Sequence, residues 1–173
     1  MNRRDTLRTL MMASGGLIAL PAWAKGWQLE NLHNHASTFS ASDQELLASI
    51  ADTIIPAGNS IGALTVGVDK FLQKLIDDCY EKETQENVKT QLAALETASL
   101  GVYGKSFVQC AQEQRQELLM KLSTSLNDKE KEFFKLMKSE TIRGFNTSKE
   151  VMVNYLDFKL VPGHYYGCVD VKA

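Results

Sequence analysis

Histidine and cysteine are the residues of this chain whose chemistry could serve a metal site or a nucleophilic reaction, and the sequence holds three of each. His33 and His35 are two residues apart, a spacing that can chelate a transition metal on a strand, but their polar neighbours favour solvated side chains. His164 could serve as a base near neutral pH, yet it has no obvious nucleophile or orienting carboxylate in sequence. We therefore predict no catalytic residue and no metal ligand in this chain.

The usual motifs of cofactor and nucleotide sites are also missing from the sequence. No G-x-G-x-x-G follows a strand, and neither a P-loop nor the C-x-x-C-H motif of haem attachment is present. Lys and Arg number 19 against 21 Asp and Glu, a net charge of −2, which excludes a basic nucleic-acid binder because phosphate neutralisation needs clustered positive charge. We expect no cofactor-binding residue in this chain and no nucleic acid among its partners.

The three cysteines are too few for a disulfide scaffold, but one bridge is a reasonable expectation. In an oxidising compartment a disulfide between Cys79 and Cys110 would close a loop of about 30 residues and stabilise the fold by about 3 kcal/mol. Cys168 would then be the unpaired cysteine. Other pairings fit the spacing equally well.

The first 24 residues have the three parts of a secretory signal peptide. A basic stretch holding Arg3 and Arg4 precedes the apolar residues Leu10 to Leu20, and Ala22-Trp23-Ala24 supplies the small–x–small pattern that predicts cleavage after Ala24. The adjacent arginines and the weakly apolar core resemble a twin-arginine signal, which exports proteins already folded. A general secretory signal is the alternative.

The rest of the chain reads as a helical domain. We divide it into a polar linker over residues 25–41 and a domain over residues 42–173 that ends in a tail. Apolar residues recur at helical spacing and no alternating strand pattern is found, so we predict an all-α fold, a compact bundle of about five to six helices. The first expected helix begins at a Ser42 capping box, and a last short one is capped by Ser148. The expected boundaries give helices over residues 42–54, 68–79, 85–103, 111–123 and 128–142. Their expected inward residues include Val88, Leu92, Leu95, Ala98, Val102, Leu118, Leu119, Phe133, Met137 and Ile142.

The C-terminal tail is richer in aromatic residues than a solvated chain end needs. Such side chains anchor interfaces because they bury a large apolar area. We therefore predict that the tail belongs to a partner-binding surface, with these candidate residues: Tyr155, Phe158, Pro162, Tyr165 and Tyr166.

Four segments in the same order resemble the gluconate 2-dehydrogenase subunit 3 family. They are residues 46–56 (LLASIADTIIP), 67–72 (GVDKFL), 133–138 (FFKLMK) and 161–168 (VPGHYYGC). From the first to the last, they span nearly all of the chain after the leader. A twin-arginine leader is also typical of this family.

The resemblance implies an accessory role in a periplasmic flavin-dependent sugar or sugar-acid dehydrogenase. In such complexes a large GMC-type subunit holds FAD and performs the oxidation, and a cytochrome c subunit usually receives the electrons. The small subunit assists folding of the large one and its export through the twin-arginine translocase. We therefore expect a periplasmic chain without a cofactor of its own, which can be membrane-associated through the complex.

Two other functions remain open from the residues alone. One is a self-sufficient periplasmic helical module that binds a small ligand, which predicts a closed apolar cavity and a monomer stable without a partner. The other is a cofactor-free enzyme that uses His164.

Overall fold

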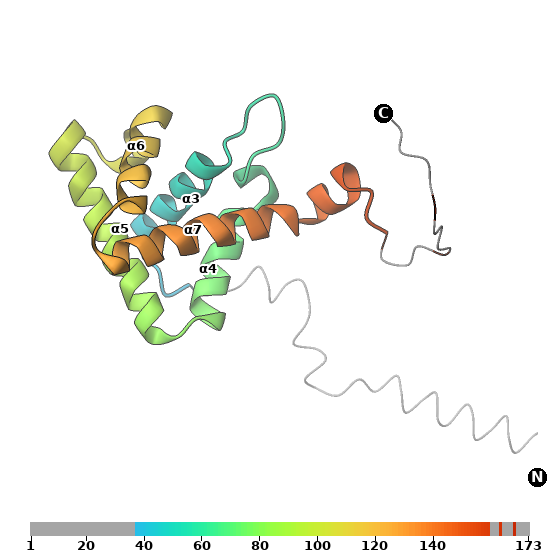
Figure 1. The fold of residues 1–173 in the computed structure, drawn as a ribbon, viewed down its shortest axis with the longest axis horizontal. Helices are drawn as coiled ribbons and strands as arrows, with labels where there is room; N and C mark the ends of the chain where they lie inside the picture. Colours follow the sequence, from blue (N-terminus) through green and yellow to red (C-terminus); the bar gives the residue numbers. More distant parts are fainter. Residues whose placement is uncertain (1–36, 160–162, 164–167, 169–173) are drawn as a thin grey trace, which may run out of the picture. The chain divides into compact units, whose positions relative to one another are not determined.

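The computed structural model describes residues 37–159, together with Gly163 and Cys168. This part of the chain folds into helices joined by short loops, and no strand occurs among the described residues (Figure 1). The predicted all-α bundle is therefore confirmed. The α-helices are α3 (Ala41–Ile54), α4 (Val68–Cys79), α5 (Lys82–Tyr103), α6 (Gln112–Ser123) and α7 (Asp128–Asn146). Shorter helical turns are η2 (Leu64–Val66), η3 (Phe107–Gln109) and η4 (Val151–Tyr155).

The N-cap of helix α3 lies two residues before the expected one. Ser40, not Ser42, is the N-cap: its backbone is extended, and its hydroxyl accepts a hydrogen bond from the amide of Asp43 at 3.2 Å. The Asp43 carboxylate in turn accepts one from the Ser40 amide at 3.1 Å, which completes a capping box. Ser40 and Ser42 each have an acidic residue three positions later, and in the structure it is Ser40 and Asp43 that form the box.

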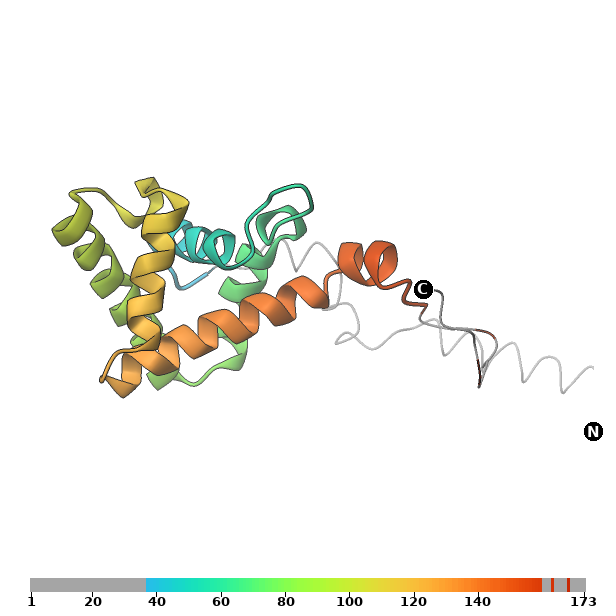
Figure 2. The same cartoon turned by 45° about the horizontal axis from the view of Figure 1, so that its top comes forward.

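Helix α3 lies at the centre of the bundle and contacts α4, α5, α6 and α7. Leu47, Ile50 and Ala51 have no exposed surface, and the helix crosses behind α7 in Figure 1. Figure 2 shows α7 running along one side of the bundle, with α5 and α6 gathered at its N-terminal end. Burial of apolar side chains around α3 is the main source of stability for this fold.

Helix α4 starts where the sequence predicts it. Gly67 precedes it with a φ of +74°, a left-handed conformation that favours glycine, and its carbonyl accepts the first helical hydrogen bond from Phe71. Val68, Leu72 and Ile76 point inward, as the expected apolar stripe requires. Val68 and Leu72 form a second small core with Ala51 and Ala63.

Helix α5 begins at Lys82, three residues earlier than expected, and its buried face differs from the prediction in its last turns. Val88, Leu92 and Leu95 are buried, but Ala98 and Val102 are exposed. Ser99 is buried instead, because the steps from 88 to 92, 95 and 99 follow one side of the helix. Its hydroxyl donates to the carbonyl of Lys105, so the buried polar group is satisfied.

Helices α6 and α7 pack against each other through the residues that the sequence marks as apolar. Leu118, Leu119, Phe133 and Met137 are buried, and Asn127 caps α7 by accepting from the amide of Lys129. The prediction for Ile142 is wrong, because 39% of its surface is exposed. At this point α7 turns Thr141 and Gly144, which are smaller, toward the bundle. Small side chains there let α7 approach α4 closely.

Candidate docking surface

The chain leaves the bundle through a cap at the end of α7. The Ser148 hydroxyl donates to the carbonyl of Phe145 at 2.8 Å and accepts from the amide of Val151 at 3.3 Å. This confirms Ser148 as the start of a further helical turn. Val151 is 5% exposed and is the residue through which this turn is anchored to the bundle.

The turn that follows, η4, is wider than an α-helix. The amide of Leu156 donates to the carbonyl of Val151 at 3.0 Å, and that of Phe158 to the carbonyl of Met152 at 2.8 Å. Asp157 between them has a φ of +47°, in the left-handed region that non-glycine residues adopt rarely. Figures 1 and 2 both place η4 beyond the C-terminal end of α7, away from α5 and α6.

Four large apolar side chains are exposed in the six-residue stretch 153–158, which begins in this turn. The exposed fractions are 50% for Val153, 56% for Tyr155, 59% for Leu156 and 48% for Phe158. Exposed apolar side chains that gather on a protein surface are common at sites of protein–protein contact. We call these four residues the η4 patch. Its composition suits a surface that a partner covers.

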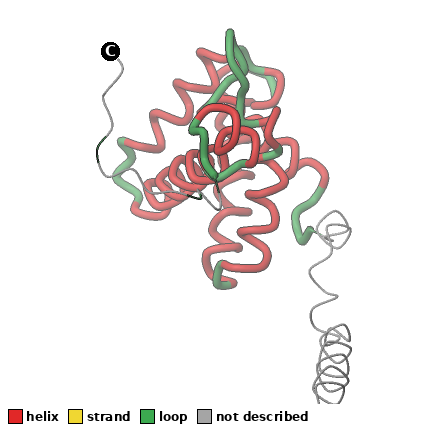
Figure 3. The backbone as a smooth tube through the Cα atoms, turned by 90° about the vertical axis from the view of Figure 1, so that its right-hand side faces the viewer, coloured by secondary structure: helices red, strands yellow, loops and turns green. Residues whose placement is uncertain are grey.

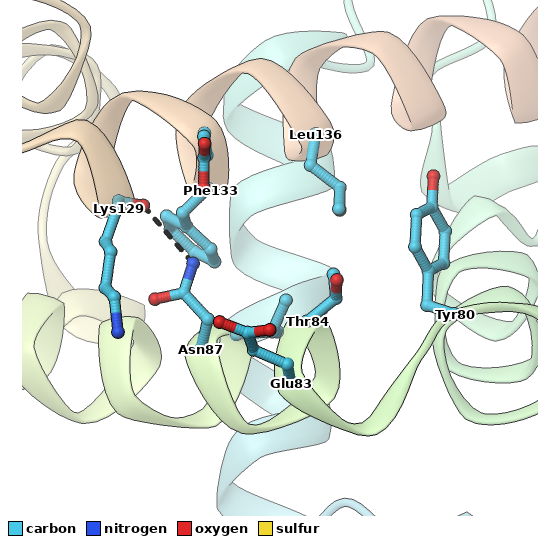
Figure 4. Close-up of a pocket in the computed structure, with 9 residues that line it drawn as sticks. Tyr80, Glu83, Thr84, Asn87, Lys129, Phe133 and Leu136 are labelled. Carbon is cyan, nitrogen blue, oxygen red and sulfur yellow. Dashed lines mark hydrogen bonds between the residues drawn. The ribbon is translucent and has the colours of Figure 1, made fainter.

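A second surface feature is a groove between α5 and α7 with a volume of about 340 Å³ (Figure 4). Val88 and Phe133 are buried at its floor, and Tyr80 lies at the corner between α4 and α5. Glu83 and Glu132 line its walls and are exposed. The groove is open to solvent along these walls.

Tyr80 connects the groove to an ionic contact beneath it. Its hydroxyl donates to Glu140 Oε1 at 3.2 Å, and Glu140 Oε2 lies 2.6 Å from the Arg143 guanidinium. Burial, and then the negative charge of Glu140, raises the pKa of Tyr80 above its ordinary value of 10.0. The phenol is therefore neutral over the physiological range, and its ring is fixed in place by Glu140.

The comparisons with known proteins identify the family. The family model described as gluconate 2-dehydrogenase subunit 3 matches residues 41–163, most of the chain. The chain belongs to the gluconate 2-dehydrogenase subunit 3 family. No curated protein and no solved structure matches it.

In this member of the gluconate 2-dehydrogenase subunit 3 family, the structure describes two of the five predicted partner-binding residues. Tyr155 and Phe158 both lie in the η4 patch with about half of their surface exposed. Pro162, Tyr165 and Tyr166 lie outside the described residues, as do His33, His35, His164, Arg3, Arg4 and the predicted cleavage site after Ala24.

Two residues of the patch, Val153 and Leu156, were missed by the sequence analysis. Their apolar character was visible in the sequence, but only the structure shows that both side chains are exposed. The groove was missed entirely, because its walls come from two helices that are distant in sequence.

The expected disulfide between Cys79 and Cys110 is not formed. Both thiols are free: Cys79 is exposed at the end of α4, whereas Cys110 is buried with its Sγ 3.2 Å from the Ser99 hydroxyl. Helix α4 and the segment after η3 present the two cysteines in different environments, and Cys168 is also free and exposed.

Within the described part of the chain, no group of three or more His, Cys, Asp or Glu side chains is arranged to hold a metal ion. No described helix combines the length and apolarity needed to span a bilayer.

Proposed function

We propose that this chain is the non-catalytic small subunit of a periplasmic FAD-dependent GMC-type sugar or sugar-acid dehydrogenase. In this role it binds the catalytic flavoprotein, assists its folding and brings it through the twin-arginine translocase. FAD belongs to the flavoprotein, and a cytochrome c subunit accepts the electrons. Membership of the gluconate 2-dehydrogenase subunit 3 family supports a subunit role. The twin-arginine leader, predicted from the sequence, supports export together with a prefolded partner.

The observation that carries this proposal is the η4 patch. The four half-exposed apolar side chains of the η4 patch contribute little to the stability of an isolated chain, because much of their apolar surface remains hydrated. Covering them with a partner would remove this apolar surface from water, which favours association. The patch therefore accords with an obligate subunit better than with a self-sufficient monomer.

The alternative of a small-ligand-binding module draws no support from the groove. That alternative predicts a closed apolar cavity, whereas the walls of the groove include the exposed residues Glu83, Lys129 and Glu132. The groove is better suited to a side chain offered from outside, as argued below.

The export role is tested by replacing both Arg3 and Arg4 with lysine in cells that produce the whole complex. The expected result is that flavoprotein and dehydrogenase activity remain in the cytoplasmic fraction. Arg8→Lys is the matched control, because it changes an arginine of the same leader outside the pair. Periplasmic flavoprotein in the double variant at the level of the control would contradict the proposal.

A further inference from the structure

The groove between α5 and α7 has an apolar floor and polar walls. Val88 and Phe133 are each 1% exposed, and Leu136 lies beside them on α7. Figure 4 shows Phe133 and Leu136 directed from α7 toward α5. The floor therefore offers apolar contact to an incoming side chain, with solvent on the open side.

The groove is short, because side chains close both of its ends. At one end the Asn87 side chain donates from Nδ2 to the carbonyl of Lys129 at 3.3 Å, which joins α5 to α7 (Figure 4). At the other end stands the ring of Tyr80. A volume of about 340 Å³ between these ends accommodates one or two long side chains, but not a helix.

Two carboxylates face the groove from its opposite walls. Glu83 belongs to α5 and Glu132 to α7, and both are exposed. Within the described part of the chain, neither of these two carboxylates takes part in a hydrogen bond or an ion pair. The walls thus carry two negative charges, with only the Lys129 ammonium as a cation among the lining residues.

We infer that this groove receives an arginine side chain of the catalytic subunit. The aliphatic stem would lie on Val88, Phe133 and Leu136, and the guanidinium would lie between Glu83 and Glu132. Arginine fits better than lysine because its planar group donates to two carboxylates at once and is more weakly hydrated. The inference rests on the proposed function, since it assigns the arginine to the flavoprotein.

Tyr80 adds a second reason for a cationic occupant. A neutral aromatic ring attracts a guanidinium through its negative face. The hydrogen bond from the Tyr80 hydroxyl to Glu140 fixes this ring at the end of the groove. The groove then offers apolar and ionic contacts to one side chain and carries an aromatic ring at its end.

The site is tested first on the full chain with N-acetyl-arginine amide as the probe. We expect backbone amide NMR shifts at Glu83, Thr84 and Glu132 that saturate with a Kd in the range of about 1–10 mM, which is reasonable for one side chain. N-acetyl-norleucine amide, which has the stem without the charge, should shift these amides at least about tenfold less at equal concentration.

Charge variants with a matched control sharpen this test. The double variant E83Q/E132Q is expected to weaken probe binding at least about tenfold. The control E45Q/E113Q makes the same charge change at exposed glutamates on α3 and α6 and should bind as the unmodified chain does. Lys129→Gln should tighten binding by about twofold, because it removes a nearby positive charge while its backbone carbonyl still accepts from Asn87.

The second test measures recovery of the flavoprotein with tagged small subunit from cells that produce the complex. E83Q/E132Q should reduce the flavin absorbance recovered per small subunit at least about threefold relative to E45Q/E113Q. Unchanged recovery, or equal NMR shifts with the arginine and norleucine probes, would overturn the inference. If the unmodified chain recovers no flavoprotein, the proposed function fails instead, and the probe titration still decides whether the groove binds a guanidinium.

Discussion

Gly144 on α7 lies directly against the ring of Phe71 on α4. A Cβ atom at Gly144 would stand 2.5 Å from Cδ1 and 2.9 Å from Cε1 of this ring, closer than carbon atoms approach each other. The Arg143 guanidinium covers the same ring at 6.0 Å from its centroid, which limits the ways in which the ring can move. The absence of a side chain at Gly144 thus sets the distance between α4 and α7.

Gly144→Ala is therefore expected to lower the free energy of unfolding by about 1–2 kcal/mol, because the overlap outweighs the better helix propensity of alanine. Urea denaturation should show a lower midpoint with an unchanged m-value. The control is Gly101→Ala in α5, where an added Cβ meets no atom within 4 Å. That variant should gain about 0.5–1 kcal/mol. Equal stabilisation of both variants would contradict the close contact.

The stabilising contribution of Tyr80 is expected to be lost at alkaline pH. Burial and the charge of Glu140 raise the pKa of Tyr80 in the folded chain above the ordinary value of 10.0 that it has when unfolded. The folded state then holds the proton more tightly, so this contribution is fully present below about pH 10 and is lost as pH rises through the folded pKa.

Tyr80→Phe should therefore cost about 1 kcal/mol at pH 8, the contribution of one hydrogen bond to Glu140. The stability difference from the unmodified chain should shrink above pH 10, as measured by urea denaturation at both pH values. Tyr155→Phe, at an exposed position, serves as the control and should change neither value. A difference that is constant with pH would show that Tyr80 titrates normally.

The three thiols are expected to react at different rates with a thiol reagent such as DTNB. In the reduced, folded chain Cys79 and Cys168 are exposed and should react rapidly, whereas Cys110 is buried and should react only after unfolding in urea. Cys79→Ser should remove one rapid thiol, and Cys110→Ser none. Rapid reaction of all three would contradict the burial of Cys110 beside Ser99.

Substitutions in the η4 patch are expected to weaken partner binding without changing the stability of the chain. Replacing Tyr155 and Phe158 together with serine should leave the melting temperature within about 2 °C, because both side chains are about half exposed. The same double variant should reduce flavoprotein recovery at least about tenfold, the effect of losing two aromatic anchors. Leu126→Ser, at a side chain that is 96% exposed between α6 and α7, is the control and should leave recovery unchanged.

Helix positions followed from the sequence where a strong local feature marked them. A glycine at position 67 marks the start of α4, and the apolar stripe from Val68 to Ile76 has a clear helical period. The ends of α4 were therefore predicted correctly. The start of α5 was not, because Glu81 at its N-cap makes no side-chain cap hydrogen bond. The face of α7 at Ile142 also escaped prediction, since the approach of α4 at Gly144 selects which residues face inward.

The two candidate surfaces also differ in how far the sequence alone could predict them. An excess of aromatic residues near the chain end pointed to Tyr155 and Phe158, and the structure finds both exposed, while their contact with a partner stays a prediction. The groove needs the register of α5 against α7, which the packing of Phe133 and the Asn87–Lys129 hydrogen bond determine. No local sequence pattern encodes that register. The thiols of Cys79 and Cys110 were paired by spacing alone, and the fold separates their environments.

The central place of α3 has a consequence for the order of events during synthesis. Among the described helices it leaves the ribosome first, yet its neighbours α4, α5, α6 and α7 all follow it. At a translation rate of about 5–20 residues per second, the side chains of Leu47 and Ile50 wait several seconds before the last of these helices emerges. The apolar face of α3 therefore stays exposed on the nascent chain until α7 is made. A chaperone that binds apolar segments would bind this helix early in synthesis and release it after α7 has emerged.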